Sequence, residues 1–186
     1  MRGPLLILRR FARQREDKSM TLRLRPYKPM DTRHIVTWVK DHDTFSAWCA
    51  DYLDWPLTEA SLEAFCHAFD GQEDRWLMTA LDERGVPVGF LMMSQADYAG
   101  NRIHLGLIIV DSSRRGQGLG TALLRLVLDY ARDILGMQRV TLRVFDHNTA
   151  ARACYRKVGF REVSLEKESF PHGEVSWDCW NMEALL

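Results

Sequence analysis

The most constraining feature of the chain is a strand, a glycine-rich turn and a helix that follow one another between residues 105 and 134. The strand is the apolar run 105–110, and the turn, 115–120, reads Arg-Gly-Gln-Gly-Leu-Gly. After it, apolar residues recur at the spacing of a buried helix face: Leu119, Ala122, Leu123, Leu126, Val127, Tyr130, Ala131 and Ile134. The glycines therefore lie where a strand turns into a helix.

This position gives the glycines a physical role. The first amides of a helix have no intrahelical acceptors, and the peptide dipoles add positive charge there, so a phosphate fits. Gly116, Gly118 and Gly120 have no Cβ to hold an anionic ligand away from the backbone. Arg114 and Arg115 bring charge to the same turn. The turn therefore predicts a site for a phosphate-bearing ligand.

Two motifs in this half of the chain match one known family. Arg115, Gly118 and Gly120 meet the acyl-CoA signature of the GNAT superfamily of acyl-CoA-dependent N-acetyltransferases. A later motif of that family, an Asn followed by a helix that carries Tyr and ends in Gly-Phe, is matched by Asn148, Ala151, Tyr155, Gly159 and Phe160. The chain thus resembles this superfamily, closely in its C-terminal half and in its pattern of elements elsewhere.

The resemblance implies one α/β domain with a mixed, mostly antiparallel, twisted central sheet. Helices would flank both faces of this sheet, and a V-shaped opening would lie beside the strand before the turn. Residues 20–186 are expected to form this domain. Residues 1–19 carry several Arg residues around a short apolar run, and we expect a disordered basic extension, with an Arg-rich targeting arm as the alternative.

Local patterns predict the individual elements. Strands are expected at 21–25, 76–81, 86–93, 105–110, 138–145, 160–165 and 175–184, with a turn at 171–173. Besides the helix after the glycine turn, helices are expected after Asp31, after Thr58 and over 152–158. If a helix continues past Asp43, its face carries four aromatic residues, Phe45, Trp48, Tyr52 and Trp55. These pack in the core or border an acceptor groove.

Acetyl transfer from a thioester to an amine needs a held acetyl-CoA and a donor to the carbonyl oxygen. The resemblance implies that strand amides contact the pantetheine chain and the acetyl oxygen, that the turn holds the pyrophosphate and that Asn148 holds the amide chain. The expected acetyl-CoA-binding residues are therefore Asn148 together with Ile108, Ile109, Val110, Arg115, Gly116, Gln117, Gly118, Leu119, Gly120 and Thr121.

The reaction also needs a proton donor to the sulfur, and Tyr155 is the predicted donor. A phenol with a pKa of about 10 can hydrogen-bond to, or protonate, a thiolate whose conjugate acid has a pKa of about 8.5. A structural role in the core is the alternative for this side chain.

His104 is the predicted proton acceptor. Counted back from Arg115, it falls where the histone acetyltransferases that the chain resembles carry a catalytic Glu, and a neutral imidazole accepts a proton near neutral pH. Strand alternation places it on the face of Gly106, opposite an apolar row formed by Ile103, Leu105 and Leu107. Asp146 and His147 are weaker candidates for the base.

One position departs from the ribosomal N-terminal acetyltransferases, which the chain also resembles. Those proteins carry a carboxylate five residues before the Asn, whereas this chain has Arg143 there. Their base and peptide substrate therefore do not transfer directly. A small-molecule amine, a protein N-terminus, a lysine or an aminoglycoside all stay open as acceptor.

Readings from other classes make different demands on the sequence. A dinucleotide-binding enzyme also uses a strand, a glycine turn and a helix, but the spacing Gly116-x-Gly118-x-Gly120 lacks the glycine three residues after the second. A non-catalytic acyl-CoA sensor or interaction module is the other alternative.

The six histidines show no paired ligand spacing, so no metal is expected. Cys154 is either a core thiol or a nucleophile beside Tyr155.

Composition sets the remaining expectations. The 186 residues carry 25 basic and 25 acidic side chains, so bulk charge favours neither nucleic acid nor a membrane surface as partner. The four cysteines, Cys49, Cys66, Cys154 and Cys179, form no Cys-x-x-Cys pair. This pattern is typical of reduced, buried thiols in a cytoplasmic protein. GNAT-like proteins are often dimers, which leaves a homodimer open.

Overall fold

The computed structural model describes residues 21–186 and shows one seven-stranded sheet. Its strand order is β1-β2-β3-β4-β5-β7-β6, and every neighbouring pair is antiparallel except β4 with β5. The strands are β1 (Arg23–Pro26), β2 (Trp76–Leu81), β3 (Pro87–Asp97), β4 (Arg102–Val110), β5 (Arg139–Phe145), β6 (Arg161–His172) and β7 (Val175–Leu185). The prediction of a mixed, mostly antiparallel sheet is confirmed. The prediction for residues 1–19 lies outside the described residues.

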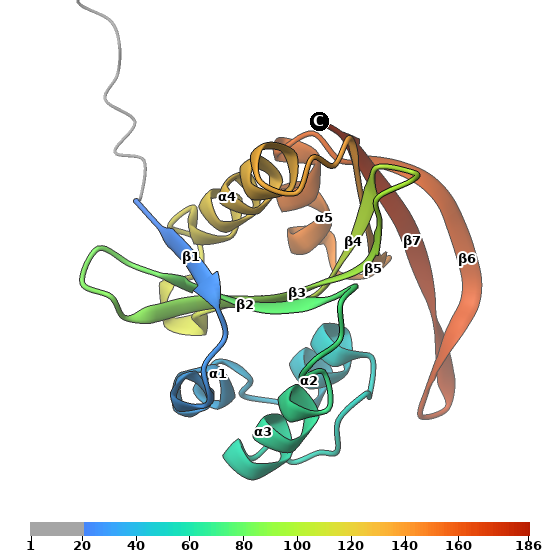
Figure 1. Cartoon of the computed structure of the whole chain (residues 1–186). Coiled ribbons are helices and arrows are strands. Elements are labelled where there is room, and N and C mark those ends of the chain that lie inside the picture. The colour runs from blue at the N-terminus through green and yellow to red at the C-terminus, as the bar shows by residue number, and fades with distance from the viewer. Residues whose placement is uncertain (1–20) are drawn as a thin grey trace, which may run out of the picture.

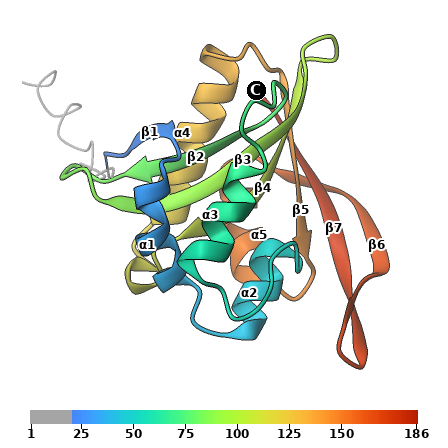
Figure 2. The same ribbon diagram turned by 60° about the horizontal axis from the view of Figure 1, so that its bottom comes forward.

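Helices cover both faces of the sheet, as predicted (Figures 1 and 2). On one face lie α1 (Thr32–Ile35), α2 (His42–Cys49) and α3 (Glu59–His67); on the other lie α4 (Leu119–Asp133) and α5 (Thr149–Lys157). Short 3₁₀ turns occupy Pro29–Asp31, Val36–Trp38 and Ser112–Arg114. None of these helices is long and apolar enough to cross a membrane.

The two helix layers give two separate apolar cores. The α4 side is filled mainly by the buried stripe of that helix, which is made of Leu119, Leu123, Leu124, Val127, Leu128 and Ala131. The α1–α3 side packs around Phe90 and includes Ile35, Trp38, Phe45 and Leu62. Because β3 is covered on both faces, its residues 87–93 form an uninterrupted run with no polar side chain, whereas burial alternates along β4.

The helix predicted after Asp31 is wrong in its cap and its length. The segment folds as three short helical pieces, and the Asp31 side chain does not cap α1 but accepts a hydrogen bond from Lys28 N at 3.0 Å, at the start of the first 3₁₀ turn. Its carboxylate is buried and accepts hydrogen bonds from both Arg25 Nη atoms at 2.7 Å and from Thr79 Oγ1 at 2.8 Å. Burial alone would raise its pKa, but these bonds lower the pKa below the ordinary value. Asp31 thus fastens the connection after β1 to β2.

The β6–β7 hairpin is longer than predicted. We expected a strand over 160–165 and a turn at 171–173, whereas β6 continues to His172. Glu166 to Ser169 are all exposed, so no alternation of apolar residues marks this part of the strand. Figure 2 shows the resulting hairpin extending past the rest of the sheet. Its tip therefore becomes available to form one side of a cavity.

Candidate functional site

The site begins where β4 and β5 part. The two strands pair in parallel only from Arg102 to Leu105 on β4 and from Arg139 to Leu142 on β5. Beyond these residues β5 continues to pair with β7, while the facing edge of β4 pairs with no strand of residues 21–186. A cavity of about 1440 Å³ opens between them. This is the V-shaped opening expected from the sequence.

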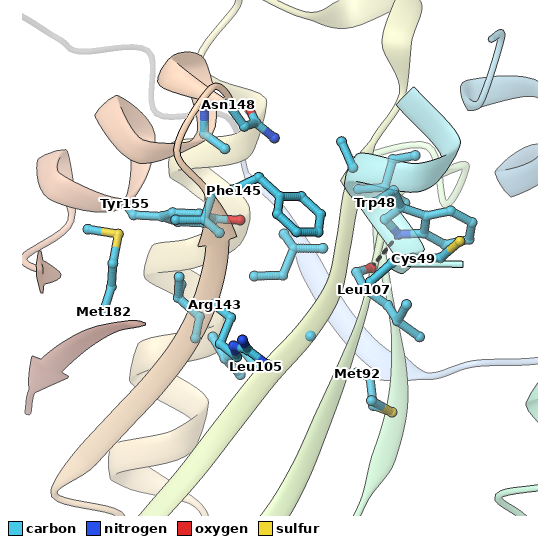
Figure 3. A pocket seen from close by; sticks show the side chains of 18 of the residues that line it. Trp48, Cys49, Met92, Leu105, Leu107, Arg143, Phe145, Asn148, Tyr155 and Met182 are labelled. Carbon is cyan, nitrogen blue, oxygen red and sulfur yellow. Dashed lines mark hydrogen bonds between the residues drawn. The ribbon is translucent and has the colours of Figure 1, made fainter. Parts of the chain in front are cut away.

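A bulge in β4 lies at the start of the opening. Met92 of β3 is opposite Gly106, but Phe90 is opposite Ile109, so β4 contains one extra residue. Leu107 has a positive φ of 51°, which is rare for a residue with a branched side chain. The indole nitrogen of Trp48 donates a hydrogen bond to the Leu107 carbonyl at 2.8 Å (Figure 3). The α2 helix therefore holds the bulge.

The bulge corrects one sequence prediction. Leu107 was expected in one row with Ile103 and Leu105, but it packs in the α1–α3 core, while the other two pack on the α4 side. The extra residue exchanges the faces, so that Ile108 and Val110 return to the α4 side. The alternation of burial continues along β4 unchanged and gives no sign of this exchange.

The glycine turn forms a cradle of unpaired amides. Gly116 and Gly118 have φ values of 76° and 83°, which only glycine adopts without strain, and Gly118 is the N-cap of α4. Among the described residues, no acceptor receives a hydrogen bond from the main-chain N–H groups of residues 115–121. These donors lie at the positive end of a 15-residue helix, and all of these residues except Gln117 line the cavity. They can bind an anion.

The two arginines of the turn differ in their environment. Arg114 Nη1 forms an ion pair with the buried carboxylate of Asp82 at 3.0 Å, so its charge is already compensated. Arg115 is exposed, lines the cavity and forms no ion pair with any residue of the described chain. Of the two, Arg115 is therefore the one free to meet a phosphate.

Gly120 has a packing role that the sequence did not reveal. A Cβ atom at this position would lie 3.3 Å from the Sγ of Cys154 on α5, and Thr121 Oγ1 contacts the same sulfur at 3.5 Å. The glycine therefore lets α4 and α5 approach closely, which favours the packing interpretation of Cys154. Its thiol is half-buried, whereas Cys49, Cys66 and Cys179 are buried as expected.

Tyr155 reaches the cavity from α5. Asn148 caps this helix by accepting a hydrogen bond from Ala151 N at 3.2 Å. The Tyr155 ring packs edge-on against Phe160, and its hydroxyl is directed toward the space between β5 and β4 (Figure 3). Burial, with a smaller contribution from neighbouring Cys154, raises the pKa of this phenol. Tyr155 therefore keeps its proton at neutral pH and can donate it.

A network of polar contacts fixes α5. Arg152 donates to Asp146 Oδ1 at 2.6 Å and to Glu162 Oε1 at 2.8 Å, and Trp180 Nε1 donates to the same Asp146 oxygen at 2.7 Å. The helix is thereby joined to β5, β6 and β7. Because Asp146 already binds two donors, the structure favours an anchoring role for it over the role of a base.

His104 lines the cavity on β4, directly opposite Thr141 in the parallel pairing. Its Nδ1 lies 3.0 Å from Thr141 Oγ1, and that hydroxyl donates to the Ile103 carbonyl. In the tautomer in which this hydroxyl accepts the Nδ1 proton, the lone pair is on Nε2. Burial, and secondly the charge of Arg143, lower the pKa of the imidazole. His104 is therefore neutral at neutral pH.

The far side of the cavity is aromatic. The predicted four-residue stripe is wrong, because α2 ends at Cys49 and Ala50 has a left-handed conformation. Tyr52 and Trp55 lie beyond the helix end with exposed fractions of 73% and 42%. The cavity is instead bordered by aromatic side chains from α2, α3 and β6 and from the segments that follow the two helices: Trp48, Tyr52, Phe65, Phe69 and Phe170.

Sequence reasoning placed Trp48 near a possible groove and Leu107 on the strand, but it missed the hydrogen bond between them and the place of Phe170 at this site. Trp48 and Leu107 are 59 positions apart, and Phe170 lies on the part of β6 that has no apolar pattern. Each of them reaches the cavity only through the packing of distant elements. Trp48 alone of these residues carries a signal in the sequence, because a buried indole N–H needs a hydrogen-bond acceptor.

Comparison with known proteins identifies the family. The acetyltransferase (GNAT) family matches residues 37–160. The chain belongs to this family. GNAT proteins use acetyl-CoA, and the match confirms the resemblance drawn from the glycine turn and the later Asn-to-Phe motif.

Several acetyltransferases are similar over different shares of the chain. The mycothiol acetyltransferase of Salinispora tropica is 39% identical over 89 residues, 47% of this chain and 29% of that protein. The N-alpha-acetyltransferase of Sulfurisphaera tokodaii is 28% identical over 70% of this chain and 73% of the relative. The peptidyl-lysine N-acetyltransferase YjaB of Escherichia coli is 30% identical over 68% of this chain and 73% of the relative. The chain thus spans less than a third of the first protein and nearly three quarters of the other two.

A solved structure shows the same fold. Spermidine N-acetyltransferase from Vibrio cholerae, in complex with CoA and spermine, superimposes with a TM-score of 0.77 at 22% identity. It covers 88% of this chain and 95% of its own. The GNAT-like fold predicted from the sequence is therefore confirmed.

The cradle generates a prediction for Gly118→Val in this GNAT protein. No atom of the described residues lies within 4 Å of a Cβ at Gly118, so the substitution acts through backbone strain of about 1–2 kcal/mol and through the added side chain in the cradle. We expect the affinity for acetyl-CoA, measured by calorimetry, to be lost.

Gly136→Val is the matched control for this variant. Gly136 follows the other end of α4, has a φ of 69° and is equally open. Both variants should lose similar stability, but Gly136→Val should bind acetyl-CoA like the wild type. Equal affinities in the two variants would contradict the cradle.

The bulge generates a prediction for Trp48→Phe, which keeps the ring but removes the donor to Leu107. A released bulge misplaces the amides of β4, so kcat should fall by about 10- to 100-fold while acetyl-CoA affinity changes little. Trp38→Phe, in the same core but without an indole hydrogen bond to the described residues, controls for packing. Equal kcat values for the two variants would show that the bond does not position the strand.

Proposed function

We propose that this GNAT protein transfers an acetyl group from acetyl-CoA to the amino group of a peptide by direct attack in a ternary complex. One observation carries the proposal. The unpaired amides of residues 115–116 and 118–121 open onto the same cavity as the protonated Tyr155 and the neutral His104. An anion site, a proton donor and a proton acceptor thus share one space.

The cradle side of the cavity suits acetyl-CoA. The amides of the turn and the side chain of Arg115 would hold the pyrophosphate, and the Asn148 side chain would hold the amide chain. The edge of β4 from Ile108 to Val110 has no partner strand on the β5 side, so its main-chain groups are free for the pantetheine and the acetyl oxygen. A preorganised amide aimed at a developing oxyanion contributes about 3 kcal/mol.

Two side chains would accept and donate the protons of the reaction. The amine nitrogen attacks the carbonyl carbon, the C–S bond breaks, and the nitrogen loses a proton to His104 directly or through a water. Tyr155 donates its phenolic proton, or a hydrogen bond, to the departing sulfur. The two pKa shifts keep His104 neutral and Tyr155 protonated before the reaction, and the raised pKa of Tyr155 favours a hydrogen bond to the sulfur over complete transfer of its proton.

Charge around the cavity favours a peptide amine over a polyamine. A polycation needs a cleft with excess negative charge. The acids that line the cavity are Asp43 and Glu183, the second paired with Arg139 at 3.1 Å. The lining bases are Arg75, which is paired with Asp74 at 3.2 Å, Arg143, which is paired with Glu166, and the exposed Arg115, so the lining has no excess of negative charge. The relatives that are similar over most of the chain are an N-alpha-acetyltransferase and a peptidyl-lysine N-acetyltransferase, which supports the same acceptor class.

An amine panel tests the acceptor class. A peptide with a free N-terminus, an N-terminally blocked peptide with one lysine, spermidine and an aminoglycoside are each incubated with acetyl-CoA, and acetylated product is counted by mass spectrometry. We expect the highest kcat/KM with one of the peptides. A higher value for spermidine would contradict the acceptor class, and binding of acetyl-CoA without any product would favour the sensor.

Tyr155→Phe tests the proton donor. The variant keeps the ring that packs against Phe160 but cannot donate, so kcat should fall by about 100-fold or more, with acetyl-CoA affinity nearly unchanged. Stopped-time assays across the pH range provide the measurement. A variant as fast as the wild type at every pH would remove Tyr155 from the mechanism.

The proposed role of His104 as the base predicts how kcat/KM declines at low pH. Because its pKa is lowered, the base stays active as the pH falls, and kcat/KM should decline only below about pH 6.5. Arg143→Gln removes a charge that lowers this pKa, so the midpoint should move to higher pH. His104→Ala should abolish this decline and slow the reaction by about 100-fold. If kcat/KM of His104→Ala declined at low pH as in the wild type, the decline would belong to another group.

A further inference from the structure

Three side chains suited to metal binding meet where α2 faces the tip of the β6–β7 hairpin. His42 and Asp43 open α2, and His172 ends β6. One ligand atom from each lies within 4.8 Å of the others, and His172 Nε2 is 3.7 Å from Asp43 Oδ1. The residues are about 130 positions apart in the sequence, so histidine spacing could not reveal this cluster.

The distances are close to those of a zinc site. Bonds of about 2.0–2.2 Å to Zn²⁺ place tetrahedral ligand atoms roughly 3.4 Å apart. The His172–Asp43 pair is near this value already. His42 and Asp43 are exposed, so rotation of their side chains can close the remaining distance.

The fold holds all three residues on defined supports. The His172 ring lies 3.9 Å from the Trp177 ring and 5.5 Å from the His42 ring, centroid to centroid. The start of α2 is fixed because Asp41 caps it through Thr44 N at 2.7 Å. The supports of the three residues are therefore in place before an ion binds, and binding has to order mainly the exposed side chains of His42 and Asp43.

We propose that His42, Asp43 and His172 form a binding site for a divalent transition-metal ion such as Zn²⁺, which links α2 to the β6–β7 hairpin. Two imidazoles and one carboxylate suit Zn²⁺, Cu²⁺ or Ni²⁺ rather than Mg²⁺ or Ca²⁺. Water completes the fourth position. The site is outside the glycine cradle and away from Tyr155, so the ion has no part in the acetyl transfer itself.

The consequence of binding follows from where the two segments lie. Asp43 on α2 and Phe170 on β6 both line the cavity, on the acceptor side. An ion that joins the two segments fixes the width of this side and restricts access of a bulky acceptor. This consequence rests on the proposed function, but the metal site itself does not.

Zinc binding is tested first by calorimetry on the full chain, stripped of metal with a chelator and free of CoA, whose thiol also binds zinc. We expect one Zn²⁺ per chain, with affinity about tenfold lower or more in His172→Gln and in Asp43→Asn. His67→Gln is the matched control, since His67 is an exposed histidine beside Asp70 at 2.5 Å, and it should bind like the wild type. Unchanged affinity in His172→Gln, or an equal loss in His67→Gln, overturns the site.

Two further measurements identify the ligands and the link. Absorption of the Co²⁺ form should lack a thiolate charge-transfer band, because the four cysteines are not ligands. Amide hydrogen exchange at the hairpin tip should slow on adding Zn²⁺ to the wild type but not to His42→Gln. A thiolate band overturns the assignment of the ligands. Equal amide exchange with and without Zn²⁺ in the wild type overturns the connection of α2 to the β6–β7 hairpin. None of these readouts uses acetyl transfer, so they stand apart from the proposed function.

The effect on access is measured by mass spectrometry of the acetylated peptide. Zn²⁺ should raise the KM for the peptide in the wild type, leave the affinity for acetyl-CoA unchanged, and have no effect on KM in His42→Gln. An unchanged KM in the wild type overturns the restriction of access.

Discussion

The hydrogen bond from Trp48 to the Leu107 carbonyl is the interaction on which the site depends. It joins α2 to the one irregular residue of β4, just beyond the point where β4 and β5 separate. Without the bulge, the side chains of β4 would keep to the faces that they occupy before Leu107, and the free edge would present different amides to the cavity. One indole nitrogen therefore links the α1–α3 layer to the chemistry on the opposite side.

The two walls of the cavity are built on different physical principles. The cradle wall is main chain, because glycines with positive φ expose amides at the start of α4. The far side of the cavity is formed by side chains, with aromatic rings from α2, α3 and β6. Amides that cannot move suit a constant partner such as a pyrophosphate, and exposed side chains can vary without loss of the fold. The fold itself is shared with spermidine N-acetyltransferase from Vibrio cholerae at only 22% identity.

Several polar residues with the chemistry of catalysis serve instead to hold the framework. Asp146 binds Arg152 and Trp180, Asp82 binds Arg114, and Asp31 fastens two strands. Each carboxylate has enough donors to compensate its loss of hydration. Tyr155 and His104 differ, because each keeps a group directed at the cavity whose pKa shift follows from burial.

The sequence by itself determined the local elements and the cradle. Periodicity located α4 and the central strands, Thr58 was recognised as the cap of α3, and the glycine turn and Tyr155 were visible as short motifs, because these features depend on neighbours within a few residues. Only the tertiary structure decided the bulge, the length of the hairpin, the role of Asp31 and the meeting of His42 with His172. Those depend on contacts between residues dozens of positions apart, and no local pattern encodes which distant surfaces will pack together.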